Sequence, residues 1–228
     1  METEENARSI HDQTSQAIRY SIVDKVLDVP FVSTDYQGFF MGAYKTCFST
    51  WVAEHALIYS CPVDELRHQE APLVRINSAC FTGDILGDRR CDCTEQLHMA
   101  MNIMKSEPGL VIYHMHHEGR GLGLTSKLHS YKKMNEEGIS TFEAHKQLTN
   151  RNDLRSYGSA ILILHDLGIT NLRLMTNNPN KKFILEANGI AVASVVGAAV
   201  DRPDIRQYLR SKRDEQAHFI DFDLIEKS

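Results

Sequence analysis

The sequence predicts an α/β fold, with some α+β character, in which a mixed β-sheet core has flanking helices. Two patterns support this prediction. Short β-rich runs follow one another between Ile22 and Asp64, separated by turn-like or charged residues, which favours an antiparallel β-region near the N-terminus. From residue 72 to residue 196, strand-like and helix-like runs alternate, as is typical of an α/β core. A chain of 228 residues is long enough to bury one sizeable core.

The N-terminal region is expected to form short strands, followed by one strand with clear alternation. The four short strands are predicted at Val29–Ser33, Gly38–Tyr44, Ser49–Ala53 and His55–Ser60. The next strand covers residues 72–80, because Val74 and Ile76 alternate with polar residues, and it ends at Cys80. The polar residues 1–18 are expected to be flexible. We therefore expect a single domain over residues 19–200, followed by a C-terminal helix or tail over residues 201–228.

Helices and strands are expected to alternate through the rest of the chain. Apolar residues at helical spacing predict a helix that begins at Thr94 and ends before Pro108. Asp153 is expected to cap a later helix. The predicted helices are Thr94–Ser106, one that follows the glycine-rich turn at His117–Gly123, Leu154–Leu167, Lys181–Ala187 and Asp204–His218. The predicted strands are Leu110–Met115, Leu172–Thr176 and Ile190–Val196.

The composition argues against several classes of protein. A net charge of −5 argues against a general nucleic-acid binder, so a nucleotide would have to be held by local Lys and Arg. No apolar run approaches the roughly 20 residues of a membrane helix, and the acidic N-terminus does not resemble a signal peptide. Five cysteines, an odd number, fit a reducing cytoplasm. Cys47 and Cys61 lie in apolar surroundings and are expected to be ordinary core residues.

Three cysteines lie within fourteen residues and predict a metal site. Cys91 and Cys93 are one residue apart, and Cys80 precedes them across a glycine-containing loop. Thiolates bind Zn²⁺ at about 2.3 Å, and three protein ligands with one open position are typical of a catalytic zinc. No fourth Cys lies nearby, and His98, the nearest His, falls a full turn into the following helix. The alternative is three reduced cysteines that bind nothing.

A second motif, His116-His-Glu-Gly-Arg-Gly-Leu-Gly, is rich in glycine. Glycines allow backbone N–H groups to approach phosphate, and the N-terminus of a following helix favours an anion. Arg120 can pair with phosphate, and Glu118 can accept hydrogen bonds from a purine or a ribose. The alternative is a tight turn between a strand and a helix with no ligand.

Two more motifs combine turn residues with cations. In Asn152-Asp-Leu-Arg-Ser-Tyr, Arg155 follows Asp153 by two residues, and the simpler interpretation is the start of a helix. In Thr176-Asn-Asn-Pro-Asn-Lys-Lys, a hydroxyl precedes basic residues at a helix start, which can hold an anion. The simpler interpretation of the second motif is an Asx-Pro turn.

These four motifs, in this order, resemble the GTP cyclohydrolase II family from about Arg75 to Val196. The family has Cys-x-Thr-Gly-Asp with Arg-Cys-Asp-Cys, then Glu-Gly-Arg-Gly, Asp-x-Arg-x-Tyr and Thr-Asn-Asn-Pro-x-Lys. The resemblance implies a GTP cyclohydrolase II-like fold with one zinc ion per chain on Cys80, Cys91 and Cys93. It implies Asp153, Arg155 and Tyr131 as catalytic residues, with Asp153 as proton acceptor.

The resemblance also implies a set of GTP contacts and several departures. The implied contacts are Arg75, Ile76, Asn77, Ser78, Ala79, Gln96, Glu118, Gly119, Arg120, Thr141, Thr176 and Lys181. At Asn77 and Ala79 the family usually has His and Glu, at His116-His117 often Arg-Gln, and at Thr149-Asn150 usually Gly-Phe. The family assigns the Arg at position 155 as a nucleophile toward the α-phosphorus. Because Arg stays protonated, a clamp on phosphoryl charge is an equal alternative.

The activity implied is hydrolysis of GTP to 2,5-diamino-6-(5-phospho-D-ribosylamino)pyrimidin-4(3H)-one, formate and pyrophosphate, the first step of riboflavin biosynthesis. The resemblance implies Mg²⁺ on the substrate phosphates, water activated by zinc for attack on C8, a homodimer, and a cytoplasmic protein with neither nucleic-acid nor membrane partners. Two alternatives remain. One is an enzyme of the same fold that acts on another purine nucleotide or releases only pyrophosphate. The other is a non-catalytic nucleotide sensor.

Overall fold

Three long antiparallel strands form one half of the sheet. The structure, a computed structural model, describes residues 20–148, 153–198, 200 and 202–216. Strand β1 (Tyr20–Pro30) pairs with β2 (Phe40–Phe48), which pairs with β3 (Trp51–Tyr59). The prediction of two strands at Ser49–Ala53 and His55–Ser60 is wrong, because only Ser49 and Thr50 turn the chain and the rest continues as β3. The strand predicted at Val29–Ser33 is also wrong, since β1 begins earlier and ends at Pro30.

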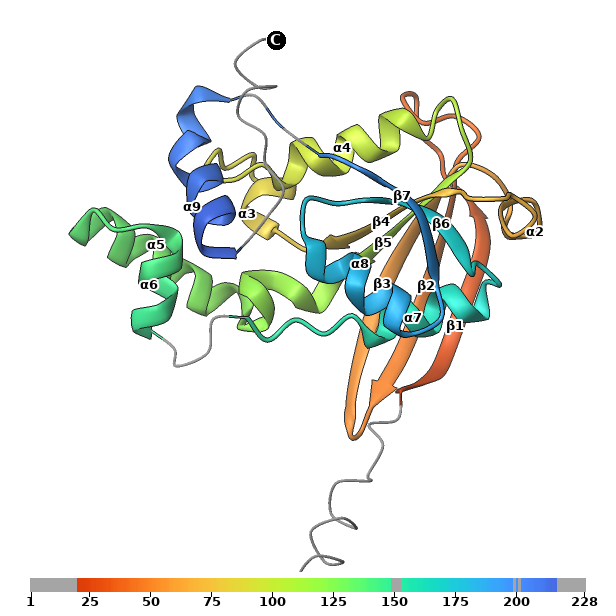
Figure 1. Ribbon diagram of the computed structural model, residues 1–228, viewed down its shortest axis with the longest axis horizontal. Helices are drawn as coiled ribbons and strands as arrows, with labels where there is room; N and C mark the ends of the chain where they lie inside the picture. Colours follow the sequence, from red (N-terminus) through yellow and green to blue (C-terminus); the bar gives the residue numbers. More distant parts are fainter. Residues whose placement is uncertain (1–19, 149–152, 199, 201, 217–228) are drawn as a thin grey trace, which may run out of the picture.

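Four parallel strands form the other half of the sheet. They are β4 (Leu73–Ser78), β5 (Gly109–His114), β6 (Asn171–Met175) and β7 (Ala191–Val196). The strand order is β1-β2-β3-β5-β4-β6-β7, and the antiparallel pairing of β3 with β5 joins the two halves (Figure 1). The predicted mixed sheet with an antiparallel N-terminal part is thereby confirmed.

Helices cover both faces of the sheet. Alternate residues of β5 point to opposite faces: Leu110 and Ile112 pack with helix α7 (Gly158–Asp166) and helix α8 (Pro179–Ala187), whereas Val111 packs with helix α4 (Cys93–Ile103). Burial on both faces explains why β5 reads as a continuous apolar run. The crossover from β4 to β5 uses α4 on one face, and the crossover from β5 to β6 uses α7 on the other. Such a reversal opens a crevice at the carboxyl ends of the strands, where open α/β sheets bind ligands.

The helix predicted at Leu154–Leu167 with Asp153 as its cap differs from the structure. Helix α7 begins only at Gly158, and its N-cap residue is Tyr157, without a side-chain cap bond. The Asp153 carboxylate instead accepts hydrogen bonds from the backbone and the guanidinium of Arg155. Because that partner satisfies the carboxylate, residues 153–157 form an irregular segment ahead of the helix.

Most of the remaining helices gather beyond the carboxyl ends of the parallel strands (Figure 1). Helices α3 (Phe81–Asp84), α5 (Gly123–Glu137), α6 (Thr141–Leu148) and α9 (Arg206–Gln216) lie on this side, and the 3-10 turns η1 (Met115–Gly121) and η2 (Pro203–Ile205) precede α5 and α9. Helix α2 (Val63–Leu66) follows β3. The sequence did not predict α2, α3 or α6. The expected flexible residues 1–18, and the end of the predicted terminal helix at His218, lie outside the described residues.

None of the helices in the described part of the chain is both long and apolar enough to span a membrane.

Candidate active site

A cavity opens at the carboxyl ends of β4, β5 and β6. Its wall is built from the end of β4 and the segments that follow these three strands, together with side chains from α4, α5, α8 and α9. The lining residues are Arg75, Asn77, Ser78, Ala79, Cys80, Arg90, Cys91, Cys93, Gln96, His117, Gly119, Arg120, Lys127, Ser130, Tyr131, Arg155, Thr176, Asn177, Asn178, Lys181, Tyr208 and Lys212. Most of the residues predicted for the site are therefore brought together here.

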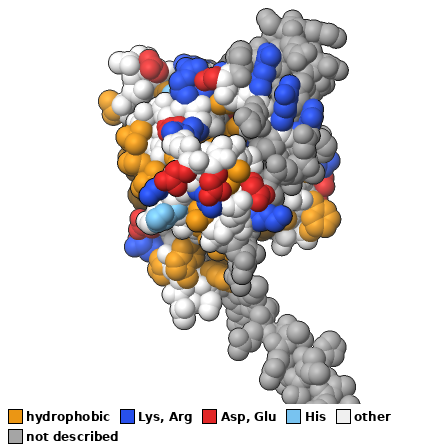
Figure 2. All heavy atoms as spheres, turned by 90° about the vertical axis from the view of Figure 1, so that its left-hand side faces the viewer, with side chains coloured by type: hydrophobic (Ala, Val, Ile, Leu, Met, Phe, Trp, Pro, Cys, Tyr) orange, Lys and Arg blue, Asp and Glu red, His pale blue; other side chains and the backbone are white. Residues whose placement is uncertain are grey.

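The wall of this cavity is strongly basic, although the whole chain has a net charge of −5. Seven cationic side chains line it, and among the described residues no Asp or Glu does so. The seven are Arg75, Arg90, Arg120, Lys127, Arg155, Lys181 and Lys212. On the outer surface of this side of the molecule, acidic and basic side chains are mixed (Figure 2). A pocket lined by one sign of charge attracts polyanions of the opposite sign.

The three cysteines form a cluster at one side of the cavity. Cys80 follows β4, whereas Cys91 and Cys93 lie at the start of α4, and the three sulfur atoms lie within 4.8 Å of one another. The Sγ atoms of Cys80 and Cys91 are 3.5 Å apart, close to the about 3.8 Å expected for two thiolates on one tetrahedral zinc. A Cβ at Gly83 would lie 3.1 Å from the Cys80 sulfur, so the glycine leaves this cluster room. The donor set and its spacing therefore fit a metal ion.

Two ion pairs that the sequence did not predict support the cysteine cluster. The Lys127 ammonium lies 3.0 Å from the Cys80 sulfur and also pairs with Glu118. Hydrogen bonds from Cys91 and Cys93, together with this ammonium, lower the pKa of Cys80 against the opposing effect of burial.

The second supporting ion pair joins the cluster to α9. Asp92, between the two neighbouring cysteines, is fully buried and accepts a hydrogen bond of 2.7 Å from Lys212. The terminal helix thereby fixes the backbone that carries Cys91 and Cys93.

Arg75 presents a buried positive charge to the cavity without a carboxylate partner among the described residues. Its Nε donates to Asn77 Oδ1 and its Nη2 donates to Gln96 Oε1, each over 2.9 Å. Both partners are neutral amides, so the hydrogen bonds orient the guanidinium without an ion pair, and Cys93, Asp92 and Asp84 act on its charge only from a distance. Burying such a charge is costly, and a bound anion would offset that cost.

Arg155 is held against the cavity wall by Asp153. Its Nε lies 2.9 Å from Asp153 Oδ1, and its Nη2 binds Asp153 Oδ2, so the pair is bidentate. Burial opposes the ionised form of Asp153, but the hydrogen bonds and charge of Arg155 lower its pKa below the usual value. For Arg155, burial opposes the charge, whereas Tyr157 and Asp153 raise the pKa. Arg155 therefore stays a cation, with its free edge 3.5 Å from Ser78 Oγ.

The glycine-rich turn is a left-handed stretch that fixes the Arg155 segment. Gly119 and Arg120 have φ of +57° and +61°, and Gly121 has φ of +84°. The Arg120 carbonyl accepts a hydrogen bond from the Leu154 N–H over 3.0 Å. A Cβ at Gly121 would lie 3.2 Å from the Leu154 carbonyl carbon, so this approach requires glycine.

The turn after β6 is both a helix cap and part of the cavity wall. Asn178 caps α8 by accepting from Asn180 N, and Thr176 Oγ1 accepts from Asn178 N, each over 3.0 Å. Lys181 extends from α8 to the backbone carbonyl of Ile76, 2.8 Å away. Burial and the neighbouring charges of Arg75, Arg155 and Lys212 lower the pKa of Lys181 well below its usual value.

Three predicted site residues, Ile76, Glu118 and Asp153, do not line the cavity. Ile76 is buried in the core and reaches the site only through its carbonyl. Glu118 is engaged with Lys127 and with the Phe81 N–H, and Asp153 stands behind Arg155. Thr141 is the first residue of α6, and its side chain lies outside what the structure describes.

Sequence reasoning missed several residues of the wall, namely Arg90, His117, Lys127, Ser130, Asn177, Asn178, Tyr208 and Lys212. Asn177 and Asn178 belong to the Thr176-Asn-Asn-Pro motif, so membership of that motif could have predicted them. Tyr208 and Lys212 lie beyond Val196, so none of the four motifs pointed to them. Lys127 carried no local signal.

Comparison with known proteins agrees with the motifs. The family model described as GTP cyclohydrolase II matches residues 28–197. The chain is 44% identical over 152 residues to the riboflavin biosynthesis protein RibBA of Cytophaga hutchinsonii, which covers 66% of this chain and 37% of that protein. It is 34% identical over 216 residues to RibBA of Phocaeicola vulgatus, which covers 94% of this chain and 52% of that protein. It is 41% identical over 170 residues to the GTP cyclohydrolase-2 of Psychromonas ingrahamii, which covers 74% of this chain and 83% of that protein. The chain thus spans only about a third to a half of the RibBA proteins it matches.

Proposed function

We propose, because the chain belongs to the GTP cyclohydrolase II family, that it hydrolyses GTP to 2,5-diamino-6-(5-phospho-D-ribosylamino)pyrimidin-4(3H)-one, formate and pyrophosphate. This reaction would begin riboflavin biosynthesis. The observation that carries the proposal is a cavity lined by seven cations beside a cluster of three cysteines. A triphosphate needs the cations, and hydrolytic opening of a purine ring needs an activated water.

The cations would divide the binding of the substrate phosphates. Arg75 lies on the α4 side of β4, where it binds Gln96. Lys181 reaches the Ile76 carbonyl from α8, and Arg155 lies beside Ser78. As pyrophosphate leaves, negative charge builds on the phosphoryl oxygens, and a guanidinium already held in place stabilises that charge. Asp153 would orient the plane of Arg155, and its lowered pKa makes it a weak proton acceptor before substrate binds.

Cys80, Cys91 and Cys93 would hold the zinc ion. A zinc ion held there supplies a Lewis acid that makes water reactive at neutral pH. Lys127 and Lys212 would keep the thiolates and Asp92 in position through their ion pairs. Tyr131, whose hydroxyl lies 3.1 Å from Thr82 Oγ1, would close the cysteine side of the cavity toward the purine. The described wall offers no carboxylate, so Mg²⁺ would arrive on the substrate phosphates.

Incubation with GTP, ATP, ITP and XTP at equal concentration tests the function. We expect formate and pyrophosphate from GTP, and rejection of ATP by about 10⁴-fold, because a site that hydrogen-bonds the guanine edge discriminates against an analogue that lacks it. The products are identified by mass, with formate and pyrophosphate measured separately. Pyrophosphate without formate would instead indicate an enzyme of the same fold that releases only pyrophosphate. Better turnover of ITP or XTP would indicate one that acts on another purine nucleotide. No product from any nucleotide would indicate a sensor.

A second candidate is an enzyme of the same fold that acts on another purine nucleotide or releases only pyrophosphate. Two residues in the cavity motivate it. Ala79 has no side-chain group to read a base, and Asn77 binds Arg75 through its amide oxygen. Asn77 is 2% exposed, so it acts as a support of Arg75. We favour GTP because Arg120, Thr176 and Lys181 all remain on the wall.

Triphosphate binding should strengthen as the pH falls from the pKa of Lys181 in the complex toward its lowered pKa in the free enzyme, by up to about tenfold per pH unit. The free enzyme has a lowered Lys181 pKa, and a bound phosphate raises it, so binding takes up a proton between the two values. Calorimetry in two buffers of different ionisation enthalpy measures this uptake. A Lys181→Met variant controls for protons taken up by the triphosphate itself. Equal proton uptake by variant and wild type would contradict this role of Lys181.

We also propose a homodimer in a reducing cytoplasm, without nucleic-acid partners. Apolar side chains on the exposed edge of the sheet, Val23, Val26 and Val29, support a self-association surface. The free state of all five cysteines supports the compartment. Sedimentation analysis at several concentrations tests the dimer.

A further inference from the structure

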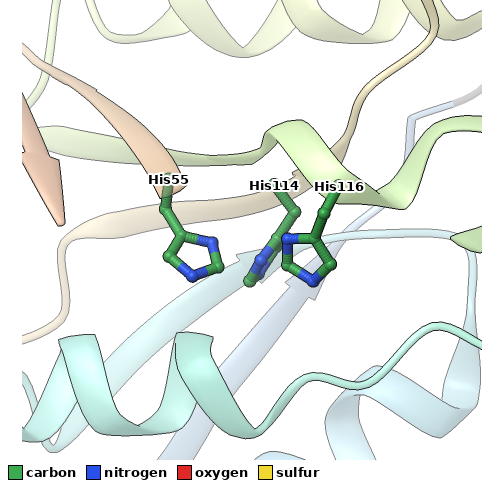
Figure 3. Close-up of side chains that lie close together, drawn as sticks. All are labelled: His55, His114 and His116. Carbon is green, nitrogen blue, oxygen red and sulfur yellow. The ribbon is translucent and has the colours of Figure 1, made fainter. Parts of the chain in front are cut away.

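Three histidines meet on one side of the sheet, apart from the cysteine cluster. His55 of β3 lies directly opposite His114 of β5 in the antiparallel register, so both side chains share a face. His116 follows two residues later in η1, and the three rings lie side by side (Figure 3). None of these three histidines lines the cavity. His116 belongs to the His-His pair at which the chain departs from its family.

Each of the three rings has a buried nitrogen without a hydrogen-bond partner in the described structure. These atoms are Nδ1 of His55, both ring nitrogens of His114, and Nδ1 of His116. The neighbouring His117 differs, because its Nδ1 meets Ser78 Oγ and its Nε2 meets the Ser156 carbonyl. A buried polar atom without a partner costs about 1–3 kcal/mol, so several in one place require an explanation.

The arrangement of the rings matches three imidazoles around one ion. The three ligand nitrogens lie within 4.8 Å of one another. The ring centroids are 4.7, 5.1 and 5.5 Å apart, and the planes cross at 80–88°. Three imidazoles bound tetrahedrally to zinc at about 2.0 Å would have centroids about 5.2 Å apart. His117 instead stacks flat on His114 with an interplanar angle of 16°, which is the geometry of packing.

Neighbouring side chains hold one ring in an orientation suited to a metal ligand. The Nε2 of His55 lies 2.8 Å from Thr46 Oγ1, which lies 2.9 Å from Ser159 Oγ. Metal-bound histidines commonly use the second ring nitrogen to bind an oxygen in this way, which leaves Nδ1 for the ion. Trp51 contacts His116 edge-on at 4.7 Å and is half exposed, so the cluster has a route to solvent on that side.

We propose that His55, His114 and His116 form a second metal site, which takes a first-row transition-metal dication such as Zn²⁺. Three imidazoles suit Zn²⁺, Cu²⁺ or Ni²⁺, whereas Mg²⁺ and Ca²⁺ require oxygen ligands. The ion would join β3, β5 and η1. Because η1 also carries Gly119 and Arg120 into the cavity, the ion would stabilise that wall.

The metal content of the 228-residue chain, after loading with Zn²⁺ and desalting, tests the proposal. Wild type should hold about two zinc ions per chain, and both His116→Gln and His55→Gln should hold about one. Cys91→Ser should also lose one ion, from the other cluster. His68→Gln, at an exposed histidine, is the matched control and should hold about two. Equal zinc content in wild type and both cluster variants would overturn the proposal.

The only tryptophan of the chain, Trp51, gives a second readout that does not depend on zinc counting. Cu²⁺ added to zinc-free protein should quench its fluorescence saturably in wild type and in His68→Gln. The quenching should disappear in His116→Gln, whose half-buried position tolerates the change. Circular dichroism confirms that each variant is folded. Unchanged quenching in a folded His116→Gln protein would exclude the site.

Discussion

Replacing Cys91 by Ser should abolish formate release and remove the ion from the cysteine cluster. Cys91 is buried, and its sulfur lies 3.5 Å from that of Cys80, so it is placed to bind the same ion. Without it, only the thiolates of Cys80 and Cys93 remain, which is one ligand fewer than a catalytic zinc site needs. Serine adds a hydroxyl that stays protonated at neutral pH and binds zinc poorly. We expect formate output to fall below detection, with zinc measured in the same samples.

The control for this change is Cys47→Ser, at a half-buried cysteine whose thiol donates to the Ser49 carbonyl. It should keep wild-type zinc content and turnover. The histidine cluster is proposed to hold an ion of its own. Zinc is therefore also counted with Cys91→Ser and Cys47→Ser made in the His116→Gln protein, where only the cysteine cluster can hold zinc. A Cys91→Ser protein with undiminished zinc and formate would eliminate the cysteine cluster as the metal centre.

The parts of the site that could be predicted are those encoded by local order along the chain. Cys80, Gly119 and Thr176 each follow a parallel strand, and the carboxyl ends of adjacent parallel strands meet at one edge. An apolar run with a polar motif behind it therefore predicts both the strand and its contribution to the site. The mixed sheet followed from the same patterns.

The parts that could not be predicted depend on partners far apart in sequence. Lys212 pairs with Asp92 across 120 residues, and Lys127 contacts Cys80 across 47. No local pattern distinguishes these lysines from solvated ones. The histidine cluster depends on the register of β3 on β5, which no local sequence pattern reveals.

Asp153 shows how a correct local rule can give the wrong structure. An acidic residue before an apolar periodic run is a good N-cap signal. In the fold, the Asp153 carboxylate pairs with the guanidinium of Arg155, two residues further along the chain. This bidentate charged pair is stronger than a single capping hydrogen bond. The same competition creates the segment that presents Arg155 to the cavity.

Replacing Arg155 by Ala should reduce pyrophosphate release by about 10³-fold or more, because a partly buried, oriented cation that stabilises transition-state charge is lost. Zinc content should stay normal, since Arg155 contacts Asp153 and Ser78 rather than the cysteines. Arg67→Ala, at an exposed ion pair with Asp64, is the matched control and should be neutral. Pyrophosphate and formate are measured together, because both should fall.

Arg155→Lys separates the roles that the side chain could have. The raised pKa of Arg155 argues against a nucleophile, which would have to lose a proton, and favours a bidentate clamp. A clamp predicts that lysine restores little of the rate, because an ammonium cannot reproduce the two parallel hydrogen bonds to Asp153 that orient the group. Near-wild-type turnover of Arg155→Lys would mean that only a positive charge is needed. A guanylyl adduct on Arg155, detected by mass spectrometry of quenched wild-type enzyme, would instead favour the nucleophile.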